Sequence, residues 1–198
     1  MTCVIMFNKI LKYVSRYVTL TEEETAFFTS LLKVRLLRKR QYLLQAGDVS
    51  RNEYFVNSGC LRSYSIDDKG MEHVVQFAIE DWWINDMYSF LTQTPATLFL
   101  EAMEDTEVIM LDRAAYEELM HKVPKFERMF RIILQNAFIA QQRRIIENMS
   151  LPAHERYLLF QQRYPQFEQR LPQHQVASYL GITPESLSRI RRQLAEKP

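Results

Sequence analysis

The chain has 198 residues, of which 47% are hydrophobic and 25% are charged. This composition fits one or two ordinary globular domains, and it excludes a disordered or low-complexity chain. The formal net charge of +1 excludes a protein that binds nucleic acid through bulk positive charge. Residues 151–198 differ, because seven Lys and Arg residues against four acids leave this end with +3. A polyanionic partner that touches one end of the chain fits this distribution.

The two cysteines, Cys3 and Cys60, form no CxxC pair or cluster. The sequence therefore predicts no metal site, neither structural zinc nor an iron–sulfur cluster, and a reducing compartment suits it. No stretch reaches the roughly 18 apolar residues that a membrane helix needs, and the first residues lack the pattern of a signal peptide. We expect a cytoplasmic protein without a membrane segment.

The first predicted element is a short helix from about Thr21 to Lys33. Thr21 suits the N-cap, and Glu24 stands three residues later, where a capping box places an acid. Apolar side chains then follow at helical spacing, namely Phe27, Phe28, Leu31 and Leu32.

Short strands separated by turns follow this helix. The turn signals recur at intervals of roughly 10 residues and are Ala46-Gly47-Asp48, Asn57-Ser58-Gly59 and Asp67-Asp68-Lys69-Gly70. The runs predicted as strands are Glu53–Val56, Leu61–Ile66, His73–Phe77, Leu98–Ala102 and Thr106–Leu111. Evenly spaced short strands predict a β-sandwich or a jelly-roll barrel.

Beyond residue 112 the pattern becomes helical. Asp112 can cap a short helix, Ala114–His121, and a longer helix is predicted over Pro124–Met149. Two apolar series run along the longer helix, one with Phe126, Phe130, Ile133, Ala137 and Ala140 and the other with Ile132, Ile139 and Ile146. Such a helix can pack against its own chain and against a second copy of itself, or be buried on both sides by its own chain. A hinge is expected at Ser150–Ala153, where a proline ends the helix.

The last part of the chain predicts a helix-turn-helix, with Gln173–Leu180 as its first helix and Thr183–Leu194 as its second. Gly181 stands where a left-handed residue ends the first helix, and Thr183 can cap the second, with Pro184 at its first position. The residues that would face the core are Val176, Ala177, Leu180, Leu187 and Ile190. The second helix of such a pair enters the major groove of DNA.

Two residues of the second helix are predicted to read bases. Arg189 can donate two hydrogen bonds to guanine, and Glu185, one turn earlier, can accept one from cytosine N4. The residues suited to phosphate contacts are Gln173, Thr183, Ser186 and Arg192. The alternative is a structural helical hairpin with a solvated basic face.

Together these motifs resemble bacterial transcription regulators of the cyclic-AMP receptor protein / fumarate-nitrate regulator (CRP/FNR) family. Gln173–Leu194 is similar to the helix-turn-helix of that family, with Glu185 and Arg189 at its base-reading positions. A third usual reader, an arginine just before the glutamate, is Pro184 here, so the usual half-site sequence is not expected. Leu43–Asp48 also resembles the opening of the family's β-roll.

The resemblance implies an α+β protein with three parts. Residues 1–123 would form a cyclic-nucleotide-binding-type β-roll (jelly roll), residues 124–150 a dimerisation helix and hinge, and residues 151–198 a winged helix-turn-helix domain. It further implies an effector-gated homodimer on a near-palindromic double-stranded DNA operator, with RNA polymerase as a partner of an activator.

The effector site departs from the family's cyclic-nucleotide pattern. Where the resemblance implies a glutamate for the ribose and an arginine for the phosphate, this chain has Asp86 and Ala96. A buried phosphate would lack its charged partner, so cyclic AMP is not the expected effector. Candidate residues for an effector pocket are Trp83, Asp86, Met87, Thr97, Phe99 and Gln141. An apolar or aromatic effector suits these residues, but several of them can equally fill the core of the roll.

Two other classes of protein remain as alternatives at this stage. A jelly-roll barrel can be a metal-dependent cupin-type enzyme, which needs several His residues and a carboxylate inside the barrel. Only His73 of the four histidines lies in the predicted barrel, and no P-loop or nucleophile elbow is present. We therefore do not expect an enzyme. An interaction module whose helix-turn-helix has lost DNA binding is the second alternative.

Overall fold

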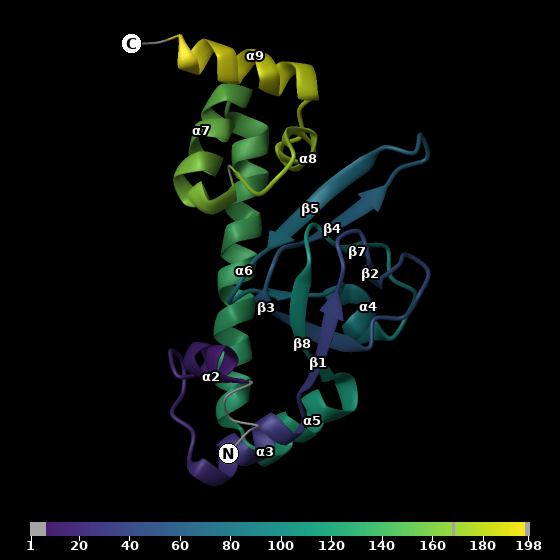
Figure 1. Cartoon of the computed structure of the whole chain (residues 1–198), viewed down its shortest axis with the longest axis vertical. Coiled ribbons are helices and arrows are strands. Elements are labelled where there is room, and N and C mark those ends of the chain that lie inside the picture. Colours follow the sequence, from purple (N-terminus) through teal and green to yellow (C-terminus); the bar gives the residue numbers. More distant parts are fainter. Residues whose placement is uncertain (1–6, 168, 197–198) are drawn as a thin grey trace. The chain divides into compact units, whose positions relative to one another are not determined.

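The computed structural model describes residues 7–167 and 169–196, and Cys3 lies outside this part. Contacts within the chain divide it into two compact units. The first unit consists of Met1–Ser65 and Gln76–Gln135, and the second of Ile66–Val75 and Asn136–Pro198. The second unit therefore combines the tip of a hairpin with the C-terminal helices, whose labels are given in Figure 1.

The strands form two four-stranded sheets, with the strand orders β1-β8-β3-β6 and β2-β7-β4-β5, and they lie in the first unit except for residues 66–75 of the β4–β5 hairpin. The strands are β1 (Lys33–Leu37), β2 (Tyr42–Leu44), β3 (Asn52–Ser58), β4 (Leu61–Ile66), β5 (Glu72–Ala78), β6 (Trp83–Ile84), β7 (Phe99–Ala102) and β8 (Thr106–Asp112). Strand β8 pairs antiparallel with β1 and β3, and β7 pairs antiparallel with β2 and β4. The predicted α+β fold with a jelly-roll domain is confirmed.

Alternating side chains of the strands fill the space between the two sheets. The buried cluster there includes Leu44, Tyr54, Val56, Leu61, Leu100, Ala102 and Val108. Neighbouring residues of β3 and β8 point the other way, because successive side chains of a strand face opposite sides of the sheet. Phe55 and Ile109 accordingly belong to a second buried cluster, which also contains helical residues.

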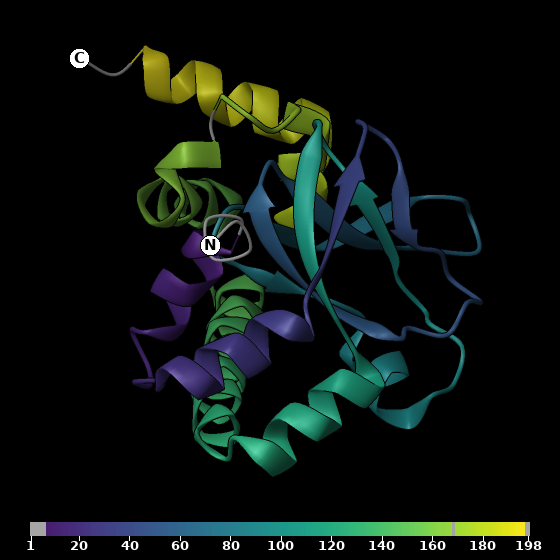
Figure 2. The same cartoon turned by 60° about the horizontal axis from the view of Figure 1, so that its bottom comes forward.

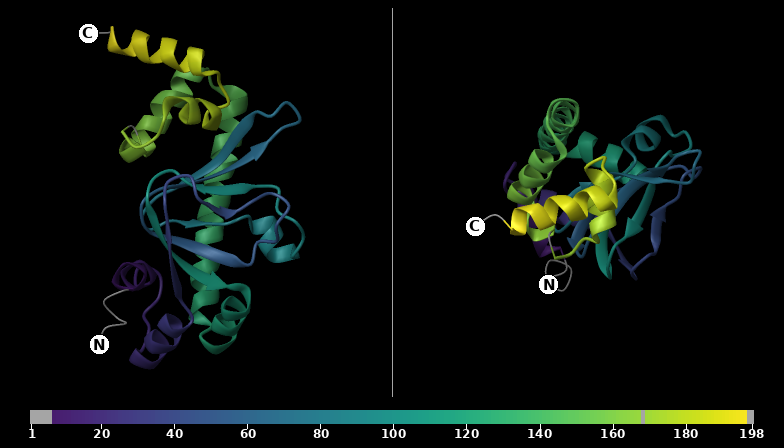
Figure 3. Two further views of the ribbon diagram at one scale, coloured as in Figure 1. Left: turned by 45° about the vertical axis from the view of Figure 1, so that its right-hand side comes forward. Right: turned by 90° about the horizontal axis from the view of Figure 1, so that it is seen from above.

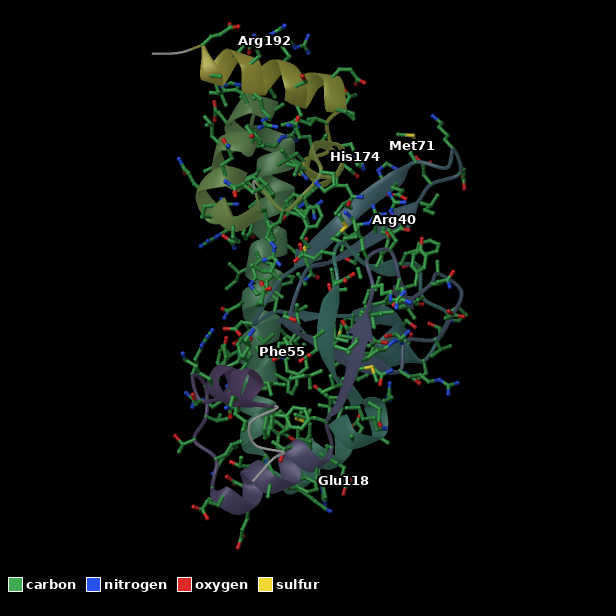
Figure 4. All side chains as sticks on the ribbon, viewed as in Figure 1. Arg40, Phe55, Met71, Glu118, His174 and Arg192 are labelled. Atoms are coloured by element: carbon green, nitrogen blue, oxygen red, sulfur yellow. The ribbon has the colours of Figure 1, made fainter. Side chains whose placement is uncertain are left out.

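Helices cover the outer face of the β1-β8-β3-β6 sheet (Figure 2). They are α2 (Asn8–Val14), α3 (Glu22–Ser30), α5 (Arg113–Lys122) and the first part of α6 (Lys125–Ser150). Phe28, Leu119 and Phe126 from these helices share the buried cluster with Phe55, which Figure 4 labels. The beginning of α6 is thus buried by its own chain.

The predicted helix caps are confirmed. Thr21 and Glu24 form a reciprocal capping box at the start of α3. Asp112 accepts a hydrogen bond from the Ala115 N–H at 2.9 Å and caps α5. Each cap satisfies backbone N–H groups that the first turn of a helix leaves without partners.

The boundaries of the first predicted helix were wrong at its end. The helix was expected to reach Lys33, but α3 ends at Ser30 and Lys33 opens β1. Pairing with β8, in which Lys33 lies opposite Met110, overrides the local helical spacing. The short elements α2, β1, β2, α4 (Met87–Thr92) and β6 were not predicted, because two to seven residues carry too little periodicity.

The second unit is mostly helical (Figure 3). Besides the hairpin tip and the second part of α6, it contains α7 (Ala153–Arg163), the 3-10 helix η1 (Pro165–Phe167), α8 (Gln173–Tyr179) and α9 (Pro184–Ala195). Aromatic rings of Phe160, Tyr164, Phe167 and Tyr179 pack together in its interior. The described residues between α7 and α8 contain η1 and turns, but no strand.

None of the helices in the described ranges combines the length and the apolar character that crossing a lipid bilayer requires.

Candidate nucleic-acid interface

The turn after α8 has the geometry that its glycine predicts. The Ile182 N–H donates to the Ala177 carbonyl and the Gly181 N–H donates to the Ser178 carbonyl, both at 3.0 Å. Gly181 adopts a φ of +64°, in the left-handed region. This pair of hydrogen bonds is a Schellman motif, which ends a helix and turns the chain sharply.

Helix α9 starts directly after this turn. The Thr183 hydroxyl oxygen accepts a hydrogen bond from the Ser186 N–H at 3.2 Å, and Pro184 is the first helical residue. The apolar residues predicted to face the core are all buried, namely Val176, Ala177, Leu180, Leu187 and Ile190. The helix-turn-helix is therefore confirmed as a structure.

The opposite side of α9 is open to solvent. Glu185, Ser188, Arg189 and Arg192 are exposed there and line one shallow depression together with Pro184. Positions three, four and seven residues apart share one face of a helix. Figure 4 shows Arg192 on the outer side of α9. Ser188 was not among the residues predicted for this site, although its place three residues after Glu185 was a sufficient signal.

Glu185 carries a negative charge at neutral pH. Its pKa is lowered by a hydrogen bond from its own backbone N–H and, to a smaller extent, by one from the Thr183 hydroxyl. An ionised carboxylate can only accept hydrogen bonds. The side chain is thus suited to a donor such as an amino group on a base edge.

The four residues assigned to phosphate contacts lie around this face. Gln173 is exposed at the start of α8, and Arg192 is exposed on α9. The hydroxyl oxygens of Thr183 and Ser186 lie 3.2 Å apart, and Thr183 also caps α9. Thr183 is exposed as well, whereas Ser186 is half-buried.

The second part of α6 exposes a row of large apolar side chains. Phe138 is 69% exposed and Met149 is 83% exposed. Further exposed members are Ile139, Ile145 and Ile146. The exposure of apolar side chains therefore differs along α6, because Phe126, Met129 and Phe130 near its start are buried.

Asp86 lies at the candidate effector site, but its carboxylate is occupied by backbone groups. It is only 2% exposed and caps α4 by accepting the Ser89 N–H at 3.0 Å. Its other oxygen accepts the N–H groups of Thr97 and Leu98 at 3.0 and 3.1 Å. The carboxylate of Asp86 therefore already binds the backbone N–H groups of this loop.

The aromatic members of the candidate pocket belong to two different packing groups. Trp83 packs edge-on against Phe55 and Phe130, in the cluster between sheet and helices. Phe99 instead stacks on Tyr64 with ring centroids 5.2 Å apart. Both residues thus contribute to the packing of the first unit.

The remaining candidate residues are less enclosed. Met87 is half-buried at the start of α4, and Thr97 is exposed. Gln141 is exposed on the part of α6 that belongs to the second unit.

A metal site finds no support in the part of the chain that the structure describes. No group of three or more His, Cys, Asp or Glu side chains in that part can hold a metal ion. His73 is an exposed residue of β5 that lies 2.9 Å from Asp67. The ligand set that a cupin-type enzyme needs does not form around it.

Comparisons with known proteins point to one family. The family model described as "Cyclic nucleotide-binding domain" matches residues 34–123. The anaerobic regulatory protein of Haemophilus influenzae is 25% identical over 186 residues, which cover 87% of this chain and 71% of that protein. The fumarate and nitrate reduction regulatory protein of Vibrio cholerae is 26% identical, with coverages of 87% and 73%.

Solved structures share the fold. FixK2 from Bradyrhizobium japonicum has a TM-score of 0.73 at 20% identity, covering 83% of this chain and 84% of its own. The c-di-GMP-responsive regulator CLP of Xanthomonas campestris has a TM-score of 0.71 at 16% identity, with coverages of 88% and 92%.

A cyclic-nucleotide-binding-type roll joined to a helix-turn-helix with an open polar face defines a DNA-binding transcription regulator. The chain is similar in sequence and fold to regulators of the CRP/FNR family, as its motifs predict. The curated relatives are named as regulatory proteins, so the cupin-type enzyme and the degenerate interaction module are not favoured.

Proposed function

We propose that the protein binds near-palindromic double-stranded DNA as a homodimer, with α9 of each protomer in a major groove. The open face of α9 carries this proposal, because it groups Glu185, Ser188, Arg189 and Arg192 over one surface depression. Major-groove base edges distinguish all four base pairs by their donors and acceptors. A face with an anion, a hydroxyl and cations can match such a pattern.

Each side chain on this face has a proposed role. Arg189 donates two hydrogen bonds to a guanine, and Glu185 accepts one from a cytosine amino group. Ser188, which lies between them, is a third candidate reader of base edges. The proposed phosphate contacts are those of Gln173, Thr183, Ser186 and Arg192.

The apolar row on α6 supports dimerisation. Phe138, Ile145 and Met149 are each more than half exposed, and they recur at helical intervals. Two such helices that pack together would remove these side chains from water. A two-fold dimer presents its recognition helices to successive major grooves about 34 Å apart. RNA polymerase is the expected partner if the bound dimer activates transcription.

The first part of the chain acts in this proposal as an effector domain that is not gated by cyclic AMP. Ala96 offers no charge to a phosphate, and Asp86 already occupies the N–H groups of Thr97 and Leu98. The proposed effector is apolar or aromatic. The candidate contact residues in the first unit are Trp83, Asp86, Met87, Thr97 and Phe99, and Gln141 is a separate candidate in the second unit. Binding of the effector would bias the hinge at Ser150–Ala153. The proposed parts before the hinge are an effector domain over 1–123 and a helix over 124–150, and the part after it is a DNA-binding domain over 151–198. We place the protein in the cytoplasm.

Selection of bound sequences from random double-stranded DNA tests the DNA-binding proposal. The unchanged protein should enrich an inverted repeat. Arg189→Ala should remove the preference at one base pair of each half-site and weaken binding by ~1–3 kcal/mol. Arg192→Ala is the matched control, since loss of a phosphate contact weakens binding to all sequences alike and lowers the salt dependence by ~1 unit of slope. An unchanged sequence preference in Arg189→Ala would contradict the assignment.

A further inference from the structure

One side chain of α8 completes the edge of a hairpin in the second unit. The Ser178 hydroxyl accepts a hydrogen bond from the Val74 N–H at 3.0 Å and donates one to the Glu72 carbonyl at 2.7 Å. Strand β5 is the outermost strand of its sheet, so these backbone groups have no neighbouring strand on that side. The Ser178 hydroxyl therefore makes the hydrogen bonds to Glu72 and Val74 that a neighbouring strand would otherwise make.

Arg144 on α6 binds the same hairpin and the same helix. Its guanidinium donates to the carbonyls of Val74 and Tyr179 at 3.0 and 2.9 Å, and also to the Val75 carbonyl. It lies 4.0 Å from the centre of the Tyr179 ring. These contacts join three segments, namely hairpin 66–75, α6 and α8, all within the second unit.

The bonding of Arg144 depends on all three segments at once. Arg144 is partly buried, and this burial lowers the pKa of its guanidinium. Among the described residues its hydrogen bonds run to carbonyl oxygens, not to a carboxylate. A desolvated charge needs a full set of partners. The arrangement is therefore stable only while hairpin and helix keep their relative positions.

Helix α8 links the hairpin contacts to the turn before α9. The Ser178 carbonyl accepts the Gly181 N–H of the Schellman motif, so one residue binds both the hairpin and the turn. The open face of α9 is not covered by these contacts, since the depression there is lined by Pro184, Ser188 and their neighbours. The hairpin contacts are thus compatible with DNA reading.

We propose that Ser178 and Arg144 form a clasp that fixes the helix-turn-helix to hairpin 66–75 and so positions α9 for DNA. Both are positioning residues, and neither touches DNA. The proposal rests on the proposed function for its DNA part, but not for the clasp itself.

Hydrogen exchange of the full chain without DNA tests the clasp. Ser178→Ala removes the acceptor of the Val74 N–H, so exchange at Val74 should accelerate about three- to tenfold. His174→Ala, an exposed residue of the same helix, is the control and should leave the exchange of Val74 unchanged. Equal protection of Val74 in Ser178→Ala and the unchanged protein would overturn the clasp.

DNA binding of Arg144→Gln tests the positioning role. The probes are a duplex with the inverted repeat that the unchanged protein selects and a duplex with one half-site scrambled. Affinity for the full repeat should fall by about tenfold, whereas affinity for the duplex with one intact half-site should change less than about twofold. The reason is that a less ordered α9 makes it harder for both protomers to bind their half-sites at the same time. The exposed neighbour Arg143→Ala is the control and should resemble the unchanged protein.

Three results would overturn the proposal or separate it from the proposed function. An equal loss on both duplexes would mean a general folding role for Arg144. No loss on either duplex would mean that Arg144 does not position α9. If the unchanged protein selects no sequence, the proposed function fails, and the exchange of Val74 alone then decides whether the clasp exists.

Discussion

Glu53 on β3 is a carboxyl group that folding takes almost completely out of water. It is 4% exposed, and its Oε1 accepts a hydrogen bond from Asn85 Nδ2 at 2.9 Å. Burial raises the pKa of Glu53 to about 8, against a smaller lowering by the Asn85 bond. At neutral pH the folded protein therefore holds a proton on this side chain.

This proton makes stability depend on pH. An unfolded chain releases it near pH 4.5, whereas the folded chain keeps it up to about pH 8. Between these values the folded state binds more protons, so the free energy of unfolding falls as pH rises, by about 1.4 kcal/mol per pH unit. Glu53→Gln should lack this decline. Urea unfolding at several pH values measures it, and parallel curves for both proteins would contradict the assignment.

Asp86 leads to a second prediction, which concerns cyclic nucleotides. Because its carboxylate holds the N–H groups of Thr97 and Leu98, a cyclic phosphate would meet a negative charge instead of an arginine. We expect that cyclic AMP and cyclic GMP, each at millimolar concentration, leave the melting temperature unchanged. A saturable rise in the melting temperature, as expected for a ligand of the folded state, would disprove this.

Gly181 shows how one residue shapes two helices. Its φ of +64° suits glycine, and an added Cβ would meet nothing within 4 Å. Gly181→Ala should therefore destabilise the protein by conformational strain alone, by ~1–2 kcal/mol. Gly181→Asn is the matched variant and should cost less, because asparagine tolerates this region. Equal free energies of unfolding for Ala and Gly at this position would show that the Schellman turn is not under strain.

The turn residues also show how much of the structure can be predicted from the sequence. Gly181, Thr183 and Pro184 act within a few residues, so their local chemistry defines the helix-turn-helix. Capping residues fixed the starts of α3 and α5 in the same way. The strands β1 and β6 could not be predicted, because they exist through pairing with distant partners in β8 and β3.

The candidate sites follow the same division. The face of α9 could be predicted, since helical spacing alone brings Glu185 and Arg189 together. The contacts of Asp86 could not, because its backbone partners lie eleven and twelve residues away across a loop. The contacts of the clasp could not be predicted either, since Ser178 binds residues more than a hundred positions earlier in the chain.

Dimerisation can be tested at the exposed part of α6. Phe138→Glu places a charge in the apolar row and should convert a dimer to a monomer at micromolar concentration, because an interface would have to bury that charge. Asn136→Glu adds the same charge on another side of the helix and is the control. Analytical ultracentrifugation measures both. A dimeric Phe138→Glu, or a monomeric unchanged protein, would contradict dimerisation through this helix.

The proline at the start of α9 affects how selective the regulator can be across a genome. A base-reading side chain contributes ~1–3 kcal/mol of discrimination at its base pair, and the side chain of Pro184 has no donor or acceptor to supply it. The operator should then carry less information than one that an arginine at position 184 also reads. More chromosomal sites would compete for each dimer. We therefore expect that control of a given gene requires either a higher copy number of the protein or several operators in one promoter.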